Sequence, residues 1–389
     1  MKKNIFFVSG DASGDIYGAQ VIQTLQQYDP NLTFSGMGGD KMQSTGMHFL
    51  YNLVREFSVM GFLAIALGMR KVLHFRKIAL DYIKKERPDL IVLIDYPGFN
   101  LHLASQVKKW DIPVVYYVTP QIWAWAPWRI KKIKKYISKM LVIFPFEVSF
   151  YQKANVPVSY VGHPLLDRIA TYQYNTNFKA ENNIISPYLA LLPGSRHIEI
   201  IGNFPVMLWA WSQLNKQQKQ PIPAILALSS EKYLPLIKKI YDKRKEKYNL
   251  PELQIIQKQT YDVLKNSHFA LVTSGTATLE TAILQTPMLV IYRVKFYHRL
   301  LKNLILQCKY FTLPNIIADK EIIPEYLVTS ETPQEIISPF LALWNEDSPE
   351  RKQMKENLQQ LCQQLEKPGA SEKVAQEIYT ILQNNGKIQ

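Results

Sequence analysis

The segment between Phe269 and Leu284 constrains the fold of this chain more than any other. Phe269 to Val272 is a short apolar run of the kind that forms a buried parallel strand. Thr273 to Thr278 is a hydroxyl-rich turn around Gly275, and apolar residues then recur at helical spacing. A strand, a small-residue turn and a helix in this order aim backbone N–H groups at a phosphate. The segment predicts an α/β domain with an anion site; an ordinary capped βα turn is the alternative.

The polar residues of this turn are suited to a phosphorylated ligand. Gly275 lets the backbone come close, and the hydroxyls of Ser274, Thr276 and Thr278 can donate hydrogen bonds. Glu280 lies further along the helix, where its carboxylate could accept a hydrogen bond from a ribose hydroxyl.

A second strand and turn of this type lies in the same half of the chain. Tyr188 to Leu192 is apolar, and the turn from Pro193 to Arg196 follows it. Arg196 is a permanent cation whose planar guanidinium matches a phosphate. Two such turns in one αβ half indicate a sugar nucleotide or a similar anionic ligand.

Composition limits the class of protein. For 389 residues, two domains of about 150–200 residues are expected. The formal charge of +14 predicts an anionic partner, namely nucleic acid, an anionic membrane surface or a phosphorylated ligand. No RNA-binding or helix-turn-helix signature accompanies the charge, so nucleic acid is not expected. Cys308 and Cys362 lack a CxxC or clustered His, which argues against disulfides and structural zinc and fits a reducing cytoplasm.

Two apolar runs of the first half end in acidic turns. Ile5 to Val8 leads to a turn with Ser13 and Asp15, which lacks the GxGxxG spacing, so NAD binding is disfavoured. The turn suits hydroxyl recognition, or Ser13 or Asp15 simply caps the next helix. Leu90 to Ile94 ends at Asp95, where open α/β sheets place ligand chemistry. Asp95 could be a general base, or a turn residue ahead of a proline.

Two other segments of this half combine apolar and basic side chains. Phe57 to Phe75 is crowded with apolar residues and predicts either a buried helix or a surface that dips into a membrane. Trp123 to Lys139 holds three tryptophans and a basic amphipathic helix, which suit an anionic membrane or a solvated face. No stretch reaches the ~18 apolar residues that span a bilayer. The candidate lipid-contacting residues are Met60, Phe62, Leu63, Ile65, Met69, Trp123, Trp125, Trp128 and Arg129.

The alternation of strands and helices predicts two Rossmann-like α/β domains. The first spans residues 1–170, and the second, which carries the phosphate turns, spans 171–348 and begins with a polar linker at 171–185. A helical tail at 349–389 is expected to pack back toward the first domain. It could do so within one chain or across a dimer, so a monomer and a homodimer both remain open.

The ordered motifs of the chain closely resemble the lipid-A-disaccharide synthase family, whose members have the GT-B glycosyltransferase fold of two Rossmann-like domains facing across a cleft. The resemblance covers nearly the whole chain. The motifs that carry it are Ser13-Gly14-Asp15, Met60-Gly61-Phe62, Ile94-Asp95-x-Pro97, Pro120-Gln121-Ile122-Trp123-Ala124-Trp125, Pro145-Phe146-Glu147, Gly162-His163-Pro164-Leu165, Leu192-Pro193-Gly194-Ser195-Arg196, Ser274-Gly275-Thr276-Ala277-Thr278-Leu279-Glu280 and Leu313-Pro314-Asn315.

The resemblance implies an inverting glycosyl transfer in lipid A biosynthesis of a Gram-negative bacterium. The donor would be UDP-2,3-diacylglucosamine, the acceptor 2,3-diacylglucosamine 1-phosphate (lipid X), and the products a β-1,6-linked disaccharide 1-phosphate and UDP. No cofactor or obligatory metal is implied. The enzyme would be cytoplasmic and peripheral on the cytoplasmic face of the inner membrane, with its apolar and basic segments on anionic lipid.

The resemblance also implies roles for single residues. Asp95 would be the catalytic base that takes the proton of the acceptor's 6-hydroxyl, and Ser13 and Asp15 would line the same cleft. The residues expected to bind UDP are Ser195, Arg196, Ser274, Gly275, Thr276, Ala277, Thr278, Glu280, Arg293, Asn315 and Glu325.

Some positions depart from the commonest family pattern. Asp11 stands where Glu is usual, Ala64 replaces a usual Glu, and Gly98 replaces a second Asp of many members after the proline, which further favours Asp95 as the base. Ala126 and Asp319-Lys320 also differ. Another GT-B enzyme of UDP-N-acetylglucosamine, an epimerase or a MurG-like transferase, is the alternative, although neither calls for the tryptophans and the basic helix. A non-catalytic basic module for membranes or RNA is the rival of a different class.

Overall fold

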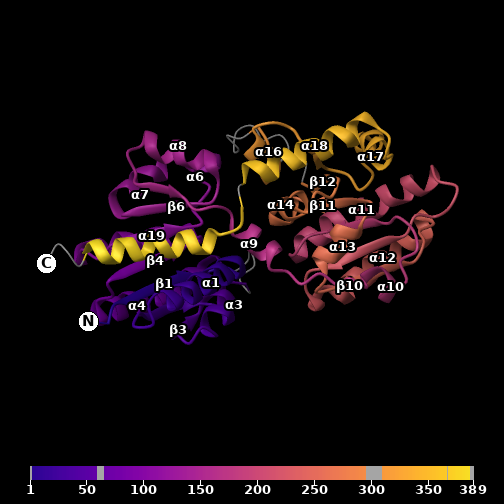
Figure 1. Cartoon of the computed structure of the whole chain (residues 1–389). Helices are drawn as coiled ribbons and strands as arrows, with labels where there is room; N and C mark the ends of the chain where they lie inside the picture. Colours follow the sequence, from indigo (N-terminus) through magenta and orange to yellow (C-terminus); the bar gives the residue numbers. More distant parts are fainter. Residues whose placement is uncertain (1, 59–64, 295–308, 366, 386–389) are drawn as a thin grey trace. The chain divides into compact units, whose positions relative to one another are not determined.

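The computed structural model describes residues 2–58, 65–294, 309–365 and 367–385. The predicted lipid contacts Met60, Phe62 and Leu63 lie outside these residues. The chain forms two compact units, of which unit 1 comprises Met1–Arg168 and Lys367–Gln389, and unit 2 comprises Ile169–Glu366. Figure 1 shows the two units in the colours of the sequence.

Unit 1 is built on a seven-stranded parallel sheet with the order β3-β2-β1-β4-β5-β6-β7. Its strands are β1 Asn4–Ser9, β2 Thr33–Gly38, β3 His48–Asn52, β4 Leu90–Ile94, β5 Val114–Tyr117, β6 Lys139–Val142 and β7 Val158–Tyr160. Its helices are α1 Ala12–Tyr28, α2 Asp40–Gln43, α3 Leu53–Ser58, α4 Ile65–Glu86, α5 Pro97–Val107, α6 Ile122–Trp125, α7 Ile130–Tyr136, α8 Pro145–Lys153, α9 Pro164–Ala170, which runs past the boundary between the units, and α19 Ala370–Asn385.

Unit 2 is built on a six-stranded parallel sheet with the order β10-β9-β8-β11-β12-β13. Its strands are β8 Leu189–Leu192, β9 Ala224–Leu228, β10 Leu253–Gln257, β11 Phe269–Thr273, β12 Met288–Arg293 and β13 Glu325–Val328. Its helices are α10 Phe178–Glu181, α11 His197–Lys216, α12 Leu234–Tyr248, α13 Thr260–Asn266, α14 Thr276–Ile283, α16 Leu313–Ala318, α17 Ile337–Trp344 and α18 Pro349–Gln364.

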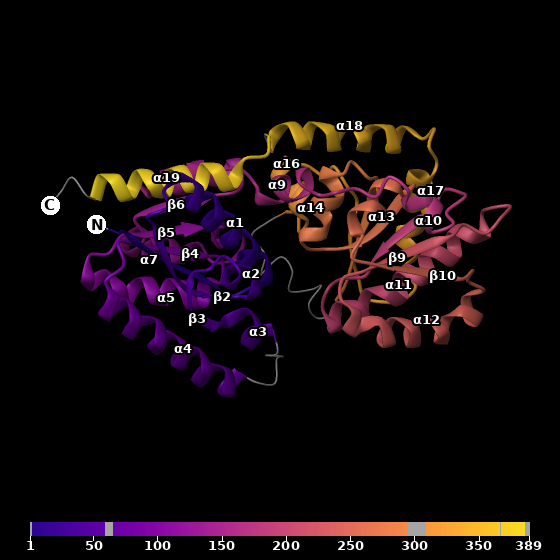
Figure 2. The same ribbon diagram turned by 60° about the horizontal axis from the view of Figure 1, so that its bottom comes forward.

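The central strands are continuous apolar runs because helices cover both faces of each sheet. Every residue of β4 is fully buried, as are those of β11 from Phe269 to Val272. Figure 2 shows α4 and α5 on one face of the unit 1 sheet and α1 with α19 on the other. The strong hydrophobicity that predicted these strands is therefore the consequence of two-sided burial.

The expected helical tail is divided between the two units. α18 belongs to unit 2, whereas α19 returns to unit 1 and packs along α1. Asp167 caps the first turn of α19, since its carboxylate accepts from the backbone N–H of Gly369 (2.5 Å), Ala370 (3.2 Å) and Ser371 (3.0 Å). Val374, Ala375, Ile378 and Leu382 of α19 are buried in the core of unit 1.

Several elements differ from their predicted form. Strands β3 and β13 do not stand out as apolar runs in the sequence, and the motif Leu313-Pro314-Asn315 opens the helix α16. α1 begins at Ala12, because Asp11 and not Ser13 or Asp15 is its cap. The polar segment at 171–185 is not a free linker, because the buried carboxylate of Asp262 binds the Tyr172 hydroxyl (2.5 Å) and the Asn175 N–H (2.8 Å).

Candidate active site

The four predicted turns all follow strands at the switch points of the two sheets. In unit 1 the strand order reverses between β1 and β4. Ser9 of β1 pairs with Ile94 of β4, so the turns that begin at Gly10 and Asp95 start side by side at the same edge of the sheet. In unit 2 it reverses between β8 and β11, where Leu192 pairs with Val272. Ligands of open parallel sheets bind in the crevice at this point. The topology therefore places each pair of predicted turns side by side within its unit.

Asp95 directly follows β4 in an uncommon backbone conformation. Asp95 and Tyr96 have φ of 45° and 46°, the left-handed region that costs non-glycine residues of order 1 kcal/mol or more each. The Asp95 N–H donates to the Tyr117 carbonyl oxygen at 3.1 Å, which continues the pairing of β4 with β5. The strand thus ends in a tight left-handed bend that begins α5.

The carboxyl group of Asp95 holds its proton more tightly than an ordinary aspartate. Burial is the main cause, and the negative charge of Asp11 adds to it, so that the pKa of Asp95 is raised to about 6. Burial likewise raises the pKa of Asp11, and the charge of Asp15 contributes. A carboxyl group with a pKa near neutrality is suited to proton transfer.

The turn after β1 is organised by Asp11, a residue that the sequence did not mark as a site. Its carboxylate accepts from the N–H groups of Ser13 at 3.1 Å and Gly14 at 3.2 Å, and so caps α1. Ser13 lies half-buried in the first turn of α1 beside this cap. An acidic N-cap is a common local signal, and Asp11 four residues before Asp15 could have been identified from it.

Asp15, which was predicted to line the cleft beside Asp95, forms bonds within the protein. Its side chain is 4% exposed, and its carboxylate accepts from the N–H groups of Gly39 (2.7 Å), Lys41 (2.9 Å) and Met42 (3.0 Å). These bonds cap α2 and fasten the turn after β1 to the turn after β2. Because three backbone donors engage this carboxylate, Asp15 positions the loop.

The tryptophan segment splits into an anchored and an exposed part. The Trp123 indole N–H donates to Glu147 at 3.3 Å, and its ring packs edge-on against Phe146, so the half-buried Trp123 is anchored to its own unit. Trp128 is 65% exposed and Arg129 is half-buried. Ile65, Met69 and Trp125 lie in α4 and α6, but their side chains are outside the described set.

Glu147 is the buried centre of this segment. Its carboxylate also accepts from the Thr119 hydroxyl at 2.7 Å and the Phe144 N–H at 3.1 Å, and burial raises its pKa to about 7. Beyond it, α7 buries Ile133 and exposes Lys131, Lys132, Lys134 and Lys135. Glu147 thus holds the segment in place while α7 presents a basic face.

In unit 2 the turn after β11 is open for an anion. No side chain among the described residues caps α14, whose N-cap is Gly275 with φ of 150°. Gly275 and Thr276 are exposed, and a Cβ at Gly275 would meet nothing within 4 Å. Ala277 is half-buried, and the Thr278 hydroxyl donates to the Gly275 carbonyl at 2.8 Å. Ser274 donates to the Phe311 carbonyl at 3.3 Å. The start of α14 therefore has the properties of an anion site.

The turn after β8 is filled by a side chain of its own helix. One carboxylate oxygen of Glu199 accepts from the N–H groups of Ser195 (2.9 Å) and Arg196 (3.2 Å). The other pairs with the Arg196 guanidinium at 2.8 Å, although Arg196 is 81% exposed. Two of the backbone donors expected for a phosphate are thus occupied by Glu199, which the sequence analysis missed. Glu at the third position of a helix is a known capping signal and could have indicated it.

Glu280 and Arg293 are held by neighbours from other elements. The Tyr261 hydroxyl donates to Glu280 at 2.7 Å, and the buried Asn203 amide oxygen accepts from the Arg293 N–H at 2.6 Å. Both side chains remain half-buried. They lie after β11 and at the end of β12, on the edge where the open turn is found.

Asn315 and Glu325, both predicted ligand contacts, form an internal hydrogen-bond network. Asn315 is fully buried, donates to Ile323 O (2.8 Å) and Glu325 (2.9 Å), and accepts from Ile322 N–H and Ile323 N–H. Glu325 accepts further from Phe311 N–H (2.9 Å) and from Thr312 N–H and its hydroxyl. These bonds use both ends of the Asn315 amide and fix the segment that contacts Ser274.

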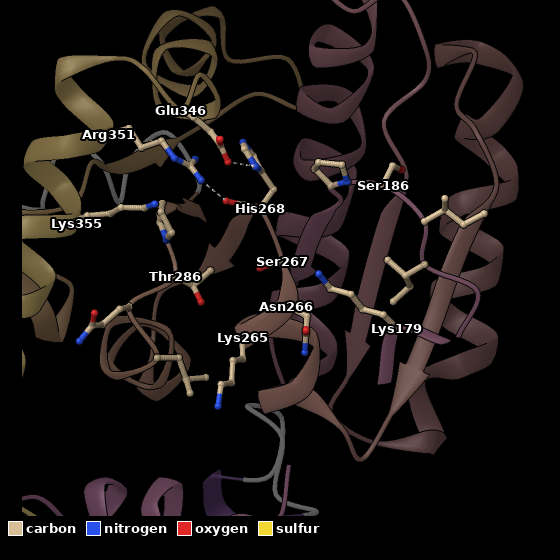
Figure 3. Close-up of a pocket in the computed structure, with 16 residues that line it drawn as sticks. Lys179, Ser186, Lys265, Asn266, Ser267, His268, Thr286, Glu346, Arg351 and Lys355 are labelled. Carbon is tan, nitrogen blue, oxygen red and sulfur yellow. Dashed lines mark hydrogen bonds and ion pairs between the residues drawn. The ribbon is translucent and has the colours of Figure 1, made fainter. Parts of the chain in front are cut away.

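A cavity of about 420 Å³ opens at the opposite edge of the unit 2 sheet, where β8, β11 and β12 begin (Figure 3). Arg351 spans it and donates to the carbonyls of Leu343 (2.6 Å) and His268 (2.7 Å), while Glu346 contacts the His268 ring at 3.3 Å. The strands separate this cavity from the predicted turns, so it is distinct from the candidate site.

The described helices include none that is both long and apolar enough to cross a bilayer.

Solved structures with the same architecture define the class of this fold. The S. aureus MnaA complex with UDP aligns over 98% of this chain and 97% of its own with a TM-score of 0.66 at 12% identity. A UDP-GlcNAc 2-epimerase from Neisseria meningitidis bound to UDP-GlcNAc aligns over 99% and 100% with a TM-score of 0.59 at 14% identity. A calicheamicin glycosyltransferase reaches 0.61 at 13% identity, with 99% of both chains covered. With two parallel-sheet α/β units, the chain has the GT-B fold of glycosyltransferases and related epimerases.

Sequence comparison identifies the family within this class. The family model described as Lipid-A-disaccharide synthetase matches residues 5–379. The lipid-A-disaccharide synthase of Coxiella burnetii is 37% identical over 98% of this chain and 99% of that protein, and that of Syntrophus aciditrophicus is 35% identical over the same shares. The chain belongs to the lipid-A-disaccharide synthase family, as its motifs predicted. It is a glycosyltransferase of lipid A disaccharide synthesis, and the epimerase and MurG-like alternatives are not favoured.

Proposed function

We propose that this enzyme joins UDP-2,3-diacylglucosamine to 2,3-diacylglucosamine 1-phosphate, with release of UDP. The near-complete family match supports this pair of substrates. The structural observation that carries the proposal is the placement of Asp95, a carboxyl group of raised pKa at the switch point of unit 1. Such a position and pKa suit a base that acts on a sugar hydroxyl near neutral pH.

The reaction is a single inverting displacement. The acceptor's 6-hydroxyl loses its proton to the Asp95 carboxylate as its oxygen bonds to the anomeric carbon of the donor. The bond from that carbon to the β-phosphate oxygen breaks, and UDP leaves with the electron pair. One base and one site for the departing diphosphate are sufficient, and general-base catalysis contributes typically 10²–10⁴-fold.

The leaving diphosphate is stabilised by unit 2. We assign it to the exposed start of α14, where Gly275, Thr276 and Ala277 offer an uncapped first turn. Arg196 and Arg293 supply positive charge, and Glu280 accepts from the ribose. Ser274 and Thr278 shape the turn through their bonds to backbone carbonyls. Ser195 contributes as part of the turn that presents Arg196.

In this proposal, three of the predicted site residues have structural roles and do not contact the substrates. Asn315 and Glu325 hold the segment at 311–323 against the turn of Ser274. Asp15 holds the turn of Asp11 and Ser13, and so it positions the region that receives the acceptor. Ser13 remains a candidate contact for an acceptor hydroxyl, because it lies half-buried beside the Asp11 cap.

The enzyme docks on an anionic membrane through unit 1. The four exposed lysines of α7 and the exposed ring of Trp128 support this part of the proposal. Each lysine near an anionic surface contributes about 1 kcal/mol, and tryptophan favours the interface. The inner membrane of a Gram-negative cell, with both acylated substrates in its cytoplasmic leaflet, would be the site of reaction.

The decisive experiment incubates the purified enzyme with both substrates in detergent micelles and follows the products by mass spectrometry. We expect a tetra-acyl disaccharide 1-phosphate together with UDP, and a kcat at least ~10²-fold lower for Asp95→Asn. Asp81→Asn, on the surface of α4, is the matched control and should keep the wild-type rate. A substrate pair that yields no disaccharide while UDP still binds would refute the assigned substrates. A near-normal rate of Asp95→Asn would remove that residue from the mechanism.

A further inference from the structure

The backbone that carries Asp95 is held by two buried side chains whose hydrogen bonds converge on one carbonyl oxygen. The Asn100 amide N–H group donates to the Asp95 carbonyl at 2.7 Å and to the Ile94 carbonyl at 3.1 Å. The Tyr116 hydroxyl donates to the same Asp95 carbonyl at 2.5 Å. Asn100 and Tyr116 are both fully buried, so neither can reach a substrate.

These bonds hold a conformation that the local sequence disfavours. Asp95 and Tyr96 are consecutive non-glycine residues in the left-handed region, with φ of 45° and 46°. Two such residues keep this conformation only where contacts from the surrounding structure hold them in it. Both carbonyl groups at the end of β4 are bound by Asn100, whose own N–H donates to the Tyr96 carbonyl at 3.1 Å.

Asn100 lowers the stability of the fold in a way that a purely structural role does not require. Its amide oxygen Oδ1 is buried and has no hydrogen-bond partner within the described residues. A buried polar atom without a partner destabilises the folded state. An apolar side chain of the same size would avoid this cost, but it could not bind the Asp95 carbonyl. The amide at this position is therefore explained by what it does to Asp95.

These hydrogen bonds engage the main-chain carbonyl of Asp95 and not its carboxylate, which therefore remains available for the reaction. The Tyr96 N–H, which forms part of the same left-handed bend, lowers the pKa of this carboxyl group, but burial and the charge of Asp11 outweigh it. Because the two buried donors hold the main-chain carbonyl, they fix the peptide from which the carboxyl group projects. A loss of either donor would let the bend relax, and the carboxyl group would change both its direction and its burial.

We propose that Asn100 and Tyr116 are positioning residues for the Asp95 base. This inference rests on the proposed function, since it requires that Asp95 take the acceptor's proton. Neither residue touches substrate in this proposal. Both act by holding the left-handed Asp95–Tyr96 peptide, and their effect should fall on the proton-transfer step and not on substrate binding.

The strand β5 offers a matched pair of variants. Tyr116 and Tyr117 are consecutive, fully buried tyrosines that point to opposite faces of the sheet. Tyr116→Phe removes the hydroxyl that binds the Asp95 carbonyl. Tyr117→Phe removes a hydroxyl that has no partner in the described part of the chain, and leaves the backbone carbonyl that binds Asp95 N–H in place.

The test measures kcat and KM for Tyr116→Phe, Tyr117→Phe and Asn100→Leu, with Asp95→Asn alongside. We expect Tyr116→Phe to lower kcat about tenfold and Asn100→Leu about 10²-fold, with each KM changed less than about threefold. The acid limb of the kcat–pH profile should move in both variants but stay in place in Tyr117→Phe. Asn100→Leu should bind UDP as the wild type does, because the nucleotide turns belong to unit 2.

The outcomes separate this inference from the proposed function. If Asp95→Asn retains activity, the base assignment itself fails. If Asp95→Asn is inactive while Tyr116→Phe matches Tyr117→Phe in kcat and in pH profile, the positioning role is overturned and the base assignment stands. Should Asn100→Leu not fold, which circular dichroism would reveal, the comparison of the two tyrosine variants decides alone.

Discussion

The ring of Tyr96 lies directly over the backbone of Gly10, so closely that a Cβ added to Gly10 would meet the ring at 2.5 Å. The same ring stacks on Phe57 at 4.8 Å between centroids and 21° between planes. The residue after the proposed base is thus clamped between the turn after β1 and the end of α3. Three separate segments of unit 1 therefore meet at this ring, next to the proposed base.

Gly10→Ala should therefore disturb the site more than its size suggests. The new methyl group must displace the body of the Tyr96 ring, and overpacking of this kind costs about 1–3 kcal/mol of stability. We expect a lower midpoint in urea and a reduced kcat. Gly98→Ala is the control: it lies in α5, meets nothing within 4 Å, and should stabilise the helix by up to ~1 kcal/mol. Equal stability of the two variants would contradict the close packing.

The rate should depend on pH through Asp95. Because the pKa of its carboxyl group is raised to about 6 and the base must be ionised, kcat should fall close to tenfold per pH unit below about 6. Asp11→Asn removes a negative charge that raises this pKa, and asparagine remains a good N-cap for α1. The acid limb of this variant should shift to lower pH. A limb that stays in place would show that Asp11 does not influence the base.

Glu199 should oppose the binding of UDP. Its carboxylate occupies the N–H groups of Ser195 and Arg196 and places a negative charge beside the proposed diphosphate site. Glu199→Gln removes the charge but keeps an oxygen that can accept from the turn. We expect UDP to bind about two- to fivefold more tightly by calorimetry, the effect of a partly exposed charge pair. The gain in UDP affinity should vanish when Glu199→Gln is combined with Arg196→Gln. Weaker UDP binding by Glu199→Gln alone would refute a repulsion between Glu199 and the diphosphate.

Glu147 should make unit 1 less stable as the pH rises. Burial raises its pKa from 4.5 to about 7, so the folded state favours the protonated form. The resulting stability is present below pH 4.5 and is lost as the pH rises through about 7. The difference in unfolding free energy between wild type and Glu147→Gln should fall by roughly 3 kcal/mol from low to high pH. Urea unfolding at pH 5 and 8 measures it, and a difference independent of pH would contradict the raised pKa.

The basic face of α7 should bind anionic vesicles. Replacement of Lys131, Lys132, Lys134 and Lys135 by Gln removes four exposed charges and should weaken co-sedimentation with vesicles containing phosphatidylglycerol by more than tenfold. Binding by the wild type should decrease with salt. The control replaces four exposed lysines of α12 in unit 2, at positions 238, 239, 243 and 245. Equal loss in both quadruple variants would indicate attraction by net charge alone, and not docking through α7.

The central strands could be predicted from the sequence because burial on both faces of the sheet requires unbroken runs of apolar residues. Leu90–Ile94 and Phe269–Thr273 are of this type, and the turns that follow them were found for the same reason. The edge strands β3 and β13 were missed, since their residues are mostly half-buried and mix polar with apolar side chains. Their pairing partners lie elsewhere in the chain, and local pattern does not reveal them.

The roles of the polar side chains were harder to predict than their location. Asp15, Asn315 and Glu325 lie near the expected edges, but each is engaged by backbone N–H groups of another segment of the chain. A free carboxylate and a carboxylate that caps another helix have the same sequence signal. Arg196 was found, whereas its partner Glu199 was overlooked, although a Glu at the third position of a helix is a capping signal.

The capping of α19 by Asp167 also has a consequence for the order in which the protein is made. Unit 1 is discontinuous, since residues 367–389 complete a unit that otherwise ends at Arg168. During translation the whole of unit 2 leaves the ribosome before α19 is available to cover α1. At ~5–20 residues per second, the intervening 198 residues (169–366) keep that apolar face of unit 1 uncovered for about 10–40 s. A chaperone that binds nascent apolar surfaces would find its target there, and release would coincide with the arrival of Val374, Ile378 and Leu382.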